Sequence, residues 1–204
     1  MIIEIGKTRI MTDPGMYSLE QHDKVSNLNM ILITHEHADH FHVESLKAAV
    51  KRMPDITVIT NDSVGEILVK EGIRHRVMIH GDVIDHAGIH IEAYGKKHAL
   101  IHKSLPQSSN VGFMIGTEPS LFFPGDALTD PKKKLDALAL PVAGPWLKIS
   151  ESIDYALKLQ PKMAFPVHDA VRSAFHHILV EKILTANGVD FTKLEEGHEL
   201  VIEA

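Results

Sequence analysis

His35-Glu36-His37-Ala38-Asp39-His40 follows the apolar run Met30-Ile31-Leu32-Ile33 and places four potential metal ligands within six residues. The apolar run predicts a buried β-strand. Because alternate side chains of an extended backbone point the same way, we expect His35, His37 and Asp39 to share one side. The last histidine of the stretch breaks this alternation and must face elsewhere. The pattern therefore suggests a second metal ion beside the first.

Length and composition predict a single domain over residues 1–204. Hydrophobic residues make up 44% and charged residues 24% of the 204 residues, which is ordinary for a globular protein. The formal net charge is −6, and the one cationic run, Lys132-Lys133-Lys134, reads as a solvated loop. Nucleic-acid binding is not excluded by this balance, but it gains no support from it. The expected partner is a small-molecule substrate, which could be anionic.

The residues that are missing narrow the chemistry further. The chain contains no cysteine, so any metal must be held by His, Asp or Glu. No basic and apolar leader of the signal-peptide kind opens the sequence, and no apolar run approaches the roughly 20 residues of a membrane span. We therefore expect a cytoplasmic protein without a membrane span.

Short strands alternate with a few helices, which argues for a layered α/β (α+β) protein with sheets covered by helices. In the helix predicted over residues 170–186, Val171, Phe175, Ile178 and Ile183 are expected to be buried. A capping box at residues 63–66 is expected to begin the short helix that ends at Gly72. The predicted strands are 2–5, 8–11, 56–60, 77–79, 89–93, 111–115, 121–123, 137–142 and 163–165. The predicted helices are 43–53, a short one that begins at the capping box and ends at Gly72, 150–159 and 170–186.

Three further strand ends deliver a side chain that can bind a metal. His98 follows the strand 89–93, Asp126 follows 121–123, and His168 follows 163–165. Buried strands are rigid, so their ends can fix ligands accurately. A lone histidine after a strand is more often a turn or surface residue, and the case rests on the whole set.

With these motifs in order, the chain resembles the metallo-β-lactamase superfamily. The motifs are Asp13 in Thr-Asp-Pro-Gly, the stretch from His35 to His40, His98, Asp126 in Pro-Gly-Asp-Ala, and His168 in Pro-Val-His-Asp. The segment 140–144 ahead of 166–168 is similar to the branch containing L-ascorbate-6-phosphate lactonase. The resemblance implies a four-layer αββα sandwich with the site at one edge.

The resemblance also implies a role for each ligand and a reaction. Two divalent ions would be bound, zinc first, with manganese or iron as alternatives. They would activate water for hydrolysis of a lactone, an ester or a phosphodiester. Asp126 would bridge the ions, Asp39 would accept the proton of the water, and Asp13 would orient the ligands from behind. The first ion would take His35, His37 and His98, and the second Asp39, His40 and His168.

Substrate contacts are less specific. Lys96, Lys97 and His102 flank the third motif and would suit a phosphate or carboxylate, although an exposed polar loop is the alternative. Trp146 is the only tryptophan, and it would either wall the pocket or fill the core. Self-association would be unsurprising for this branch of the superfamily.

Two other functions remain open. Diiron redox proteins of this fold typically carry a glutamate where His37 stands and partner with a flavin domain, and both features are missing here. A non-enzymatic metal- or metabolite-binding protein is the second alternative, although degenerate members usually lose ligands. Many members of the superfamily keep a glycine two residues after the Asp-His pair, where this chain has Phe41-His42-Val43. Because ribonuclease-type members often keep this glycine, its absence makes a nuclease function less expected.

Overall fold

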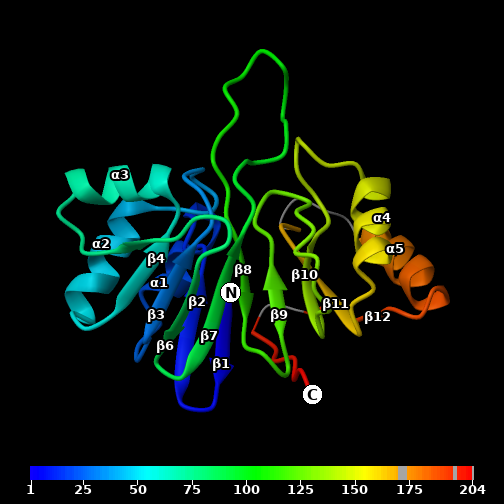
Figure 1. Cartoon of the computed structure of the whole chain (residues 1–204), viewed down its shortest axis with the longest axis horizontal. Helices are drawn as coiled ribbons and strands as arrows, with labels where there is room; N and C mark the ends of the chain where they lie inside the picture. Colours follow the sequence, from blue (N-terminus) through cyan, green and yellow to red (C-terminus); the bar gives the residue numbers. More distant parts are fainter. Residues whose placement is uncertain (170–173, 195–196, 204) are drawn as a thin grey trace.

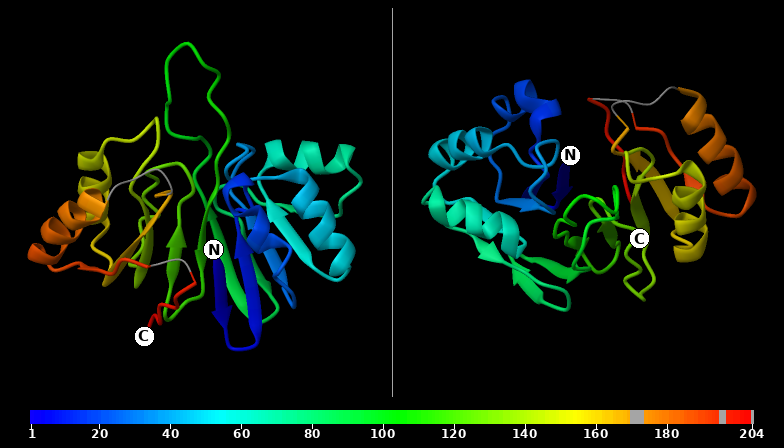
Figure 2. Two further views of the ribbon diagram at one scale, coloured as in Figure 1. Left: turned by 180° about the vertical axis from the view of Figure 1, so that it is seen from behind. Right: turned by 90° about the horizontal axis from the view of Figure 1, so that it is seen from above.

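Two β-sheets pack against each other and carry helices on their outer faces (Figure 1). The computed structural model describes residues 1–169, 174–194 and 197–203. Seen from above, helices α2 and α3 lie on one outer side and helices α4 and α5 on the other (Figure 2). The αββα sandwich predicted from the motifs is confirmed.

The first sheet comes from the N-terminal part of the chain. Its strand order is β1-β2-β3-β4-β5, in which the hairpin β1-β2 is antiparallel and the remaining pairs are parallel. The strands are β1 (Ile2–Ile5), β2 (Thr8–Thr12), β3 (Met30–Ile33), β4 (Thr57–Thr60) and β5 (Arg76–Val77). The associated helices are η1 (Met16–Ser18), α1 (Leu19–His22), α2 (Val43–Arg52) and α3 (Asp62–Lys70).

The second sheet has the order β12-β11-β10-β9-β8-β7-β6. Its strands are antiparallel from β6 to β9 and parallel from β9 to β12. They are β6 (Val83–His86), β7 (Ile89–Tyr94), β8 (Gly112–Ile115), β9 (Leu121–Phe123), β10 (Ala137–Pro141), β11 (Met163–Val167) and β12 (Asp190–Phe191). Helices α4 (Ile149–Leu159) and α5 (Ala174–Ala186) cover its outer face.

Strand β3 shows why the run before the histidine motif is apolar throughout. Met30 and Leu32 point between the sheets, where they join the core that also contains Phe113 of β8. Ile31 and Ile33 point the other way, into the core under helices α2 and α3. A strand that is covered on both faces needs apolar residues at every position rather than at alternate ones.

Several sequence predictions are corrected at the element ends. Helix α3 begins after Asn61, whose side chain accepts a hydrogen bond from the Val64 backbone N–H at 3.0 Å, so the capping box at residues 63–66 is wrong. Ser63 instead donates its hydroxyl to the Glu36 carboxylate at 2.7 Å. Strands β6 and β12 and the turns at 16–22 were not predicted, because each is short and lacks a clear period.

The inner face of the last helix also differs from the prediction. Ile178 is 59% exposed, whereas Val180 and Leu184 are fully buried against the second sheet, and Ile183 packs beside them. Val171 and the side chain of Phe175 lie outside the described residues. None of the helices described is long and apolar enough to cross a membrane.

The Leu32→Ala variant tests the core between the two sheets. Leu32 is fully buried there, so we expect the free energy of unfolding to fall by about 2–5 kcal/mol. Val69→Ala, at a side chain that is 69% exposed, should change it by less than about 0.5 kcal/mol. Urea unfolding measures both values, and equal losses in the two variants would contradict this packing.

Candidate metal centre

Four strands end at the same edge of the sandwich and bring the seven predicted ligands together. Strand β3 leads into residues 35–40, β7 leads to His98, β9 to Asp126 and β11 to His168. The donor atoms form three overlapping groups, and within each group they lie within 4.8 Å of one another. The groups are His35 with His37 and His98, His35 with His40 and Asp126, and Asp39 with His40 and His168.

Asp126 lies at the centre of these groups and is only 3% exposed. Its Oδ2 atom is 3.3 Å from the Nε2 atoms of both His98 and His168, and 4.0 Å from that of His35. Its Oδ1 atom is 3.1 Å from His40 Nε2. Asp126 therefore contacts histidines of all three groups, as a carboxylate that bridges two metal ions would.

Four imidazole nitrogens that face Asp126 have the environment expected of metal ligands. The Nε2 atoms of His35, His40, His98 and His168 are buried, and none has a hydrogen-bond partner among the described residues. Buried polar atoms in folded proteins are normally paired. A divalent cation would satisfy these nitrogens, and imidazole and carboxylate are donors that such cations accept.

Burial and charge set the protonation of the ligands. Burial and the neighbouring imidazole of His40 lower the pKa of His35 well below its usual range, so His35 is neutral and able to bind a metal. Burial also opposes charge on His40, but Asp13 and Asp126 override it and raise the pKa of His40 to about 10. Likewise, Asp126 and Asp39 raise the pKa of His168 to about 9 despite burial. A cation entering the centre would have to displace these protons.

Asp13 lies behind the histidines, where the resemblance places it. Its Oδ2 atom is 2.7 Å from His40 Nδ1 and accepts the Thr34 hydroxyl at 2.8 Å. The other carboxylate oxygen accepts the Thr34 backbone N–H at 2.8 Å. Because Thr34 Oγ1 is also 2.9 Å from His35 Nδ1, Asp13 holds two imidazole rings in place, one of them through Thr34. Thr34 was not predicted, and its position directly before the motif was the available signal.

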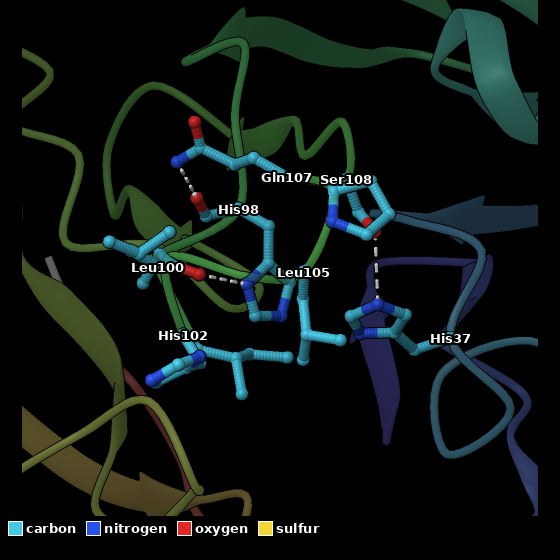
Figure 3. Close-up of a pocket in the computed structure, with 10 residues that line it drawn as sticks. His37, His98, Leu100, His102, Leu105, Gln107 and Ser108 are labelled. Carbon is cyan, nitrogen blue, oxygen red and sulfur yellow. Dashed lines mark hydrogen bonds between the residues drawn. The ribbon is translucent and has the colours of Figure 1, made fainter.

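The loop 99–108 holds His37 and His98, two of the three remaining candidate histidine ligands (Figure 3). His37 Nε2 is 3.0 Å from the Ser108 hydroxyl, and His98 Nδ1 hydrogen-bonds to the Ala99 carbonyl. The Gln107 side chain donates to the His98 carbonyl at 2.7 Å. These contacts fix the orientation of both rings, so the ends of the loop belong to the centre.

Asn110 is a residue that the sequence analysis did not assign to the centre. It is buried, accepts a hydrogen bond from the Asp126 backbone N–H at 3.0 Å and donates to the Pro124 carbonyl at 2.9 Å. Gly125, between them, has a φ of +63°, and a Cβ atom there would approach Asn110 Oδ1 to 2.5 Å. The Pro-Gly pair signals the tight turn, but only the fold reveals the asparagine that pins it.

Trp146 is mostly buried and lies against the ligands. Its indole N–H donates to Asp126 Oδ2 at 2.7 Å, and its ring centroid is 5.7 Å from that of His98. A Cβ atom on Gly144 would approach the indole nitrogen to 2.7 Å, so a glycine at this position leaves room for the ring. Trp146 is not among the residues that line the depression beside His37 and His98, so its role as a wall of the substrate pocket stays a prediction.

The remaining candidate substrate contacts separate into two groups. His102 lines a small depression beside His37 and His98 (Figure 3). Lys96 and Lys97 are exposed, and neither is among the residues that line this depression. The assignment of Lys96 and Lys97 as substrate contacts therefore stays a prediction from the sequence.

Comparisons with known proteins agree with this architecture. A family model described as a beta-lactamase superfamily domain matches residues 1–168. Protein Rv0786c of Mycobacterium tuberculosis is 33% identical over 96% of this chain and 92% of its own length. Igni18, a metallo hydrolase of Ignicoccus hospitalis, has a TM-score of 0.78 at 18% identity, covering 97% of this chain and 91% of its own. CmlA, a diiron beta-hydroxylase of Streptomyces venezuelae, has a TM-score of 0.71 at 16% identity, and the match covers 95% of this chain and 51% of CmlA.

The Trp146→Phe variant tests the hydrogen bond to Asp126. It keeps an aromatic ring but removes the N–H donor, so we expect metal affinity to fall roughly 10- to 100-fold. Competition with a chelator measures the affinity. Tyr17→Phe, which removes a hydroxyl from a side chain that is 68% exposed, is the control and should leave it unchanged. Equal affinities for the Trp146→Phe variant and the unmodified protein would show that the indole does not support the centre.

Proposed function

Since this chain belongs to the metallo-β-lactamase superfamily, we propose that it is a metal-dependent hydrolase of an ester-like bond in a small molecule. The bond is a lactone, a carboxylic or thioester, or a phosphodiester. The observation that supports this most is the convergence of four buried imidazole Nε2 atoms on the Asp126 carboxylate, at 3.1–4.0 Å, none of them with a well-formed hydrogen bond among the described residues. A similarity to the lactonase-like branch is part of the proposal and favours the lactone.

The ligands would divide between two cations. His35, His37 and His98 would hold the first, and the grouping of their donor atoms supports this set. Asp39, His40 and His168 would hold the second, and their donor atoms form a group of their own. Asp126 would bridge the two, which its contacts from both carboxylate oxygens support. Zinc is the proposed ion, and manganese or iron would suit the same nitrogen and oxygen donors.

Two bound cations would lower the pKa of water toward neutrality and polarise the carbonyl or phosphoryl oxygen of the substrate. Asp39 is half-buried, with 29% of its side chain exposed, and its Oδ2 atom is 3.2 Å from His168 Nε2. The contact with His168 lowers the pKa of Asp39, despite partial burial, so its carboxylate is ionised at neutral pH. Asp39 would accept a proton from the attacking water, and a proton would pass to the leaving oxygen as the C–O or P–O bond breaks.

A redox role is the alternative with a specific observation behind it. The diiron beta-hydroxylase CmlA shares this fold, so the fold by itself does not separate the two functions. An absorption spectrum of the purified protein distinguishes them, because a diferric centre absorbs visible light and a zinc centre does not.

The Asp126→Ala and His35→Ala variants test the proposed hydrolase. Each removes a ligand from the centre, so we expect loss of bound metal and a fall in kcat/KM of roughly a hundredfold or more. Metal content by elemental analysis and turnover of γ-lactones, p-nitrophenyl acetate and bis-p-nitrophenyl phosphate measure these effects. His90→Ala is the control, because His90 contacts Asp85 and Glu92 away from the centre. Variants that retain both metal and turnover would rule this function out.

A further inference from the structure

The loop 99–108 extends beyond the rest of the sandwich, above the sheets in Figure 1. It begins at Ala99, whose carbonyl hydrogen-bonds to His98, and it ends at Ser108, whose hydroxyl contacts His37. Both anchors are attached to candidate ligands of the first cation. The two ends of the loop are therefore held in place relative to the reacting centre.

The middle of this loop exposes apolar side chains. Leu100 is 56% exposed, Ile101 36% and Leu105 51%. Leu100 and Leu105 line the same depression as His37 and His98 (Figure 3). Several large apolar side chains in ten residues, directly beside polar ligands, are typical of a surface that binds something apolar.

The depression itself is too small to hold a substrate. Its volume is about 10 Å³, which is room for about one water molecule. No lysine, arginine, aspartate or glutamate is among the described residues that line it. A chain attached to the reacting bond would therefore lie over the exposed faces of Leu100, Ile101 and Leu105.

We propose that the loop 99–108 binds an apolar acyl or alkyl group, so that the substrates are esters or lactones bearing an apolar chain. This inference rests on the proposed hydrolase function. The anchors at Ala99 and Ser108 place a chain on Leu100 and Leu105 next to His37 and His98, where the bond is broken. The proposed substrate therefore carries an apolar chain, in contrast to the phosphate or carboxylate group that Lys96 and Lys97 suggested from the sequence.

A homologous series of p-nitrophenyl esters, from acetate to octanoate, tests the proposal on the metal-loaded protein. We expect kcat/KM to rise roughly two- to fourfold for each added methylene, since each is partly removed from water on the loop. In the double variant Leu100→Ser with Leu105→Ser, this dependence on chain length should flatten. Ile178→Ser on helix α5, at a residue of similar exposure, is the matched control and should keep it.

A second measurement separates failure of this inference from failure of the hydrolase function. Alkyl hydroxamates of increasing length bind through a head group that favours divalent metals, and fluorescence of the single tryptophan, Trp146, reports their binding. Tighter binding with length, lost in the double variant, supports the loop site even if no ester is turned over. Binding that is absent or independent of length overturns the inference. The inference is also overturned if the double variant changes the oligomeric state but keeps the dependence on chain length. The loop would then bind a second copy of this chain instead of the substrate.

Discussion

Burial of the Asp126 carboxylate among imidazole nitrogens is the interaction on which the rest of the structure depends. An ionised carboxylate at 3% exposure is costly unless opposite charge or hydrogen bonds compensate it. Although burial works against ionisation, the imidazoles of His168, His40 and His98 hold the pKa of Asp126 well below its usual range. Trp146 donates a hydrogen bond to its side chain, and Asn110 accepts one from its backbone N–H. Each of these partners comes from a different part of the chain, so the centre also ties the two sheets together.

The layers of the sandwich explain how such distant residues meet. Strand β3 is apolar on both faces because one face meets the second sheet and the other meets helices α2 and α3. Strand β10 behaves similarly, with Leu138 and Leu140 packed toward α4 and α5, and Ala137 and Ala139 on the opposite face. Rigid, doubly covered strands hold their ends in place, and the polar ligands are grouped at those ends.

The sequence was informative where a pattern is local. Periodicity and turn residues identified the hairpin of β1 and β2, helix α2 and the strands that precede Asp126 and His168. The motifs identified residues that the structure brings into one cluster. The roles of Thr34, Asn110 and Ser108 as hydrogen-bond partners within the centre were not predicted, because a hydrogen bond between distant segments leaves no periodic signal. The capping box failed for a related reason: Ser63 has a more distant acceptor in Glu36.

The tethering of the loop 99–108 at both ends affects how this protein can diverge. Ala99 contacts His98 through its backbone carbonyl, whereas Gln107 and Ser108 contact His98 and His37 through their side chains, so exchanges at Gln107 and Ser108 would remove these contacts. The seven positions between Ala99 and Gln107 are exposed and include none of the candidate ligands, so sequence drift or directed evolution can change them at little cost to folding. New binding preferences would therefore arise by replacing the middle of one loop while the cluster of candidate ligands is inherited unchanged.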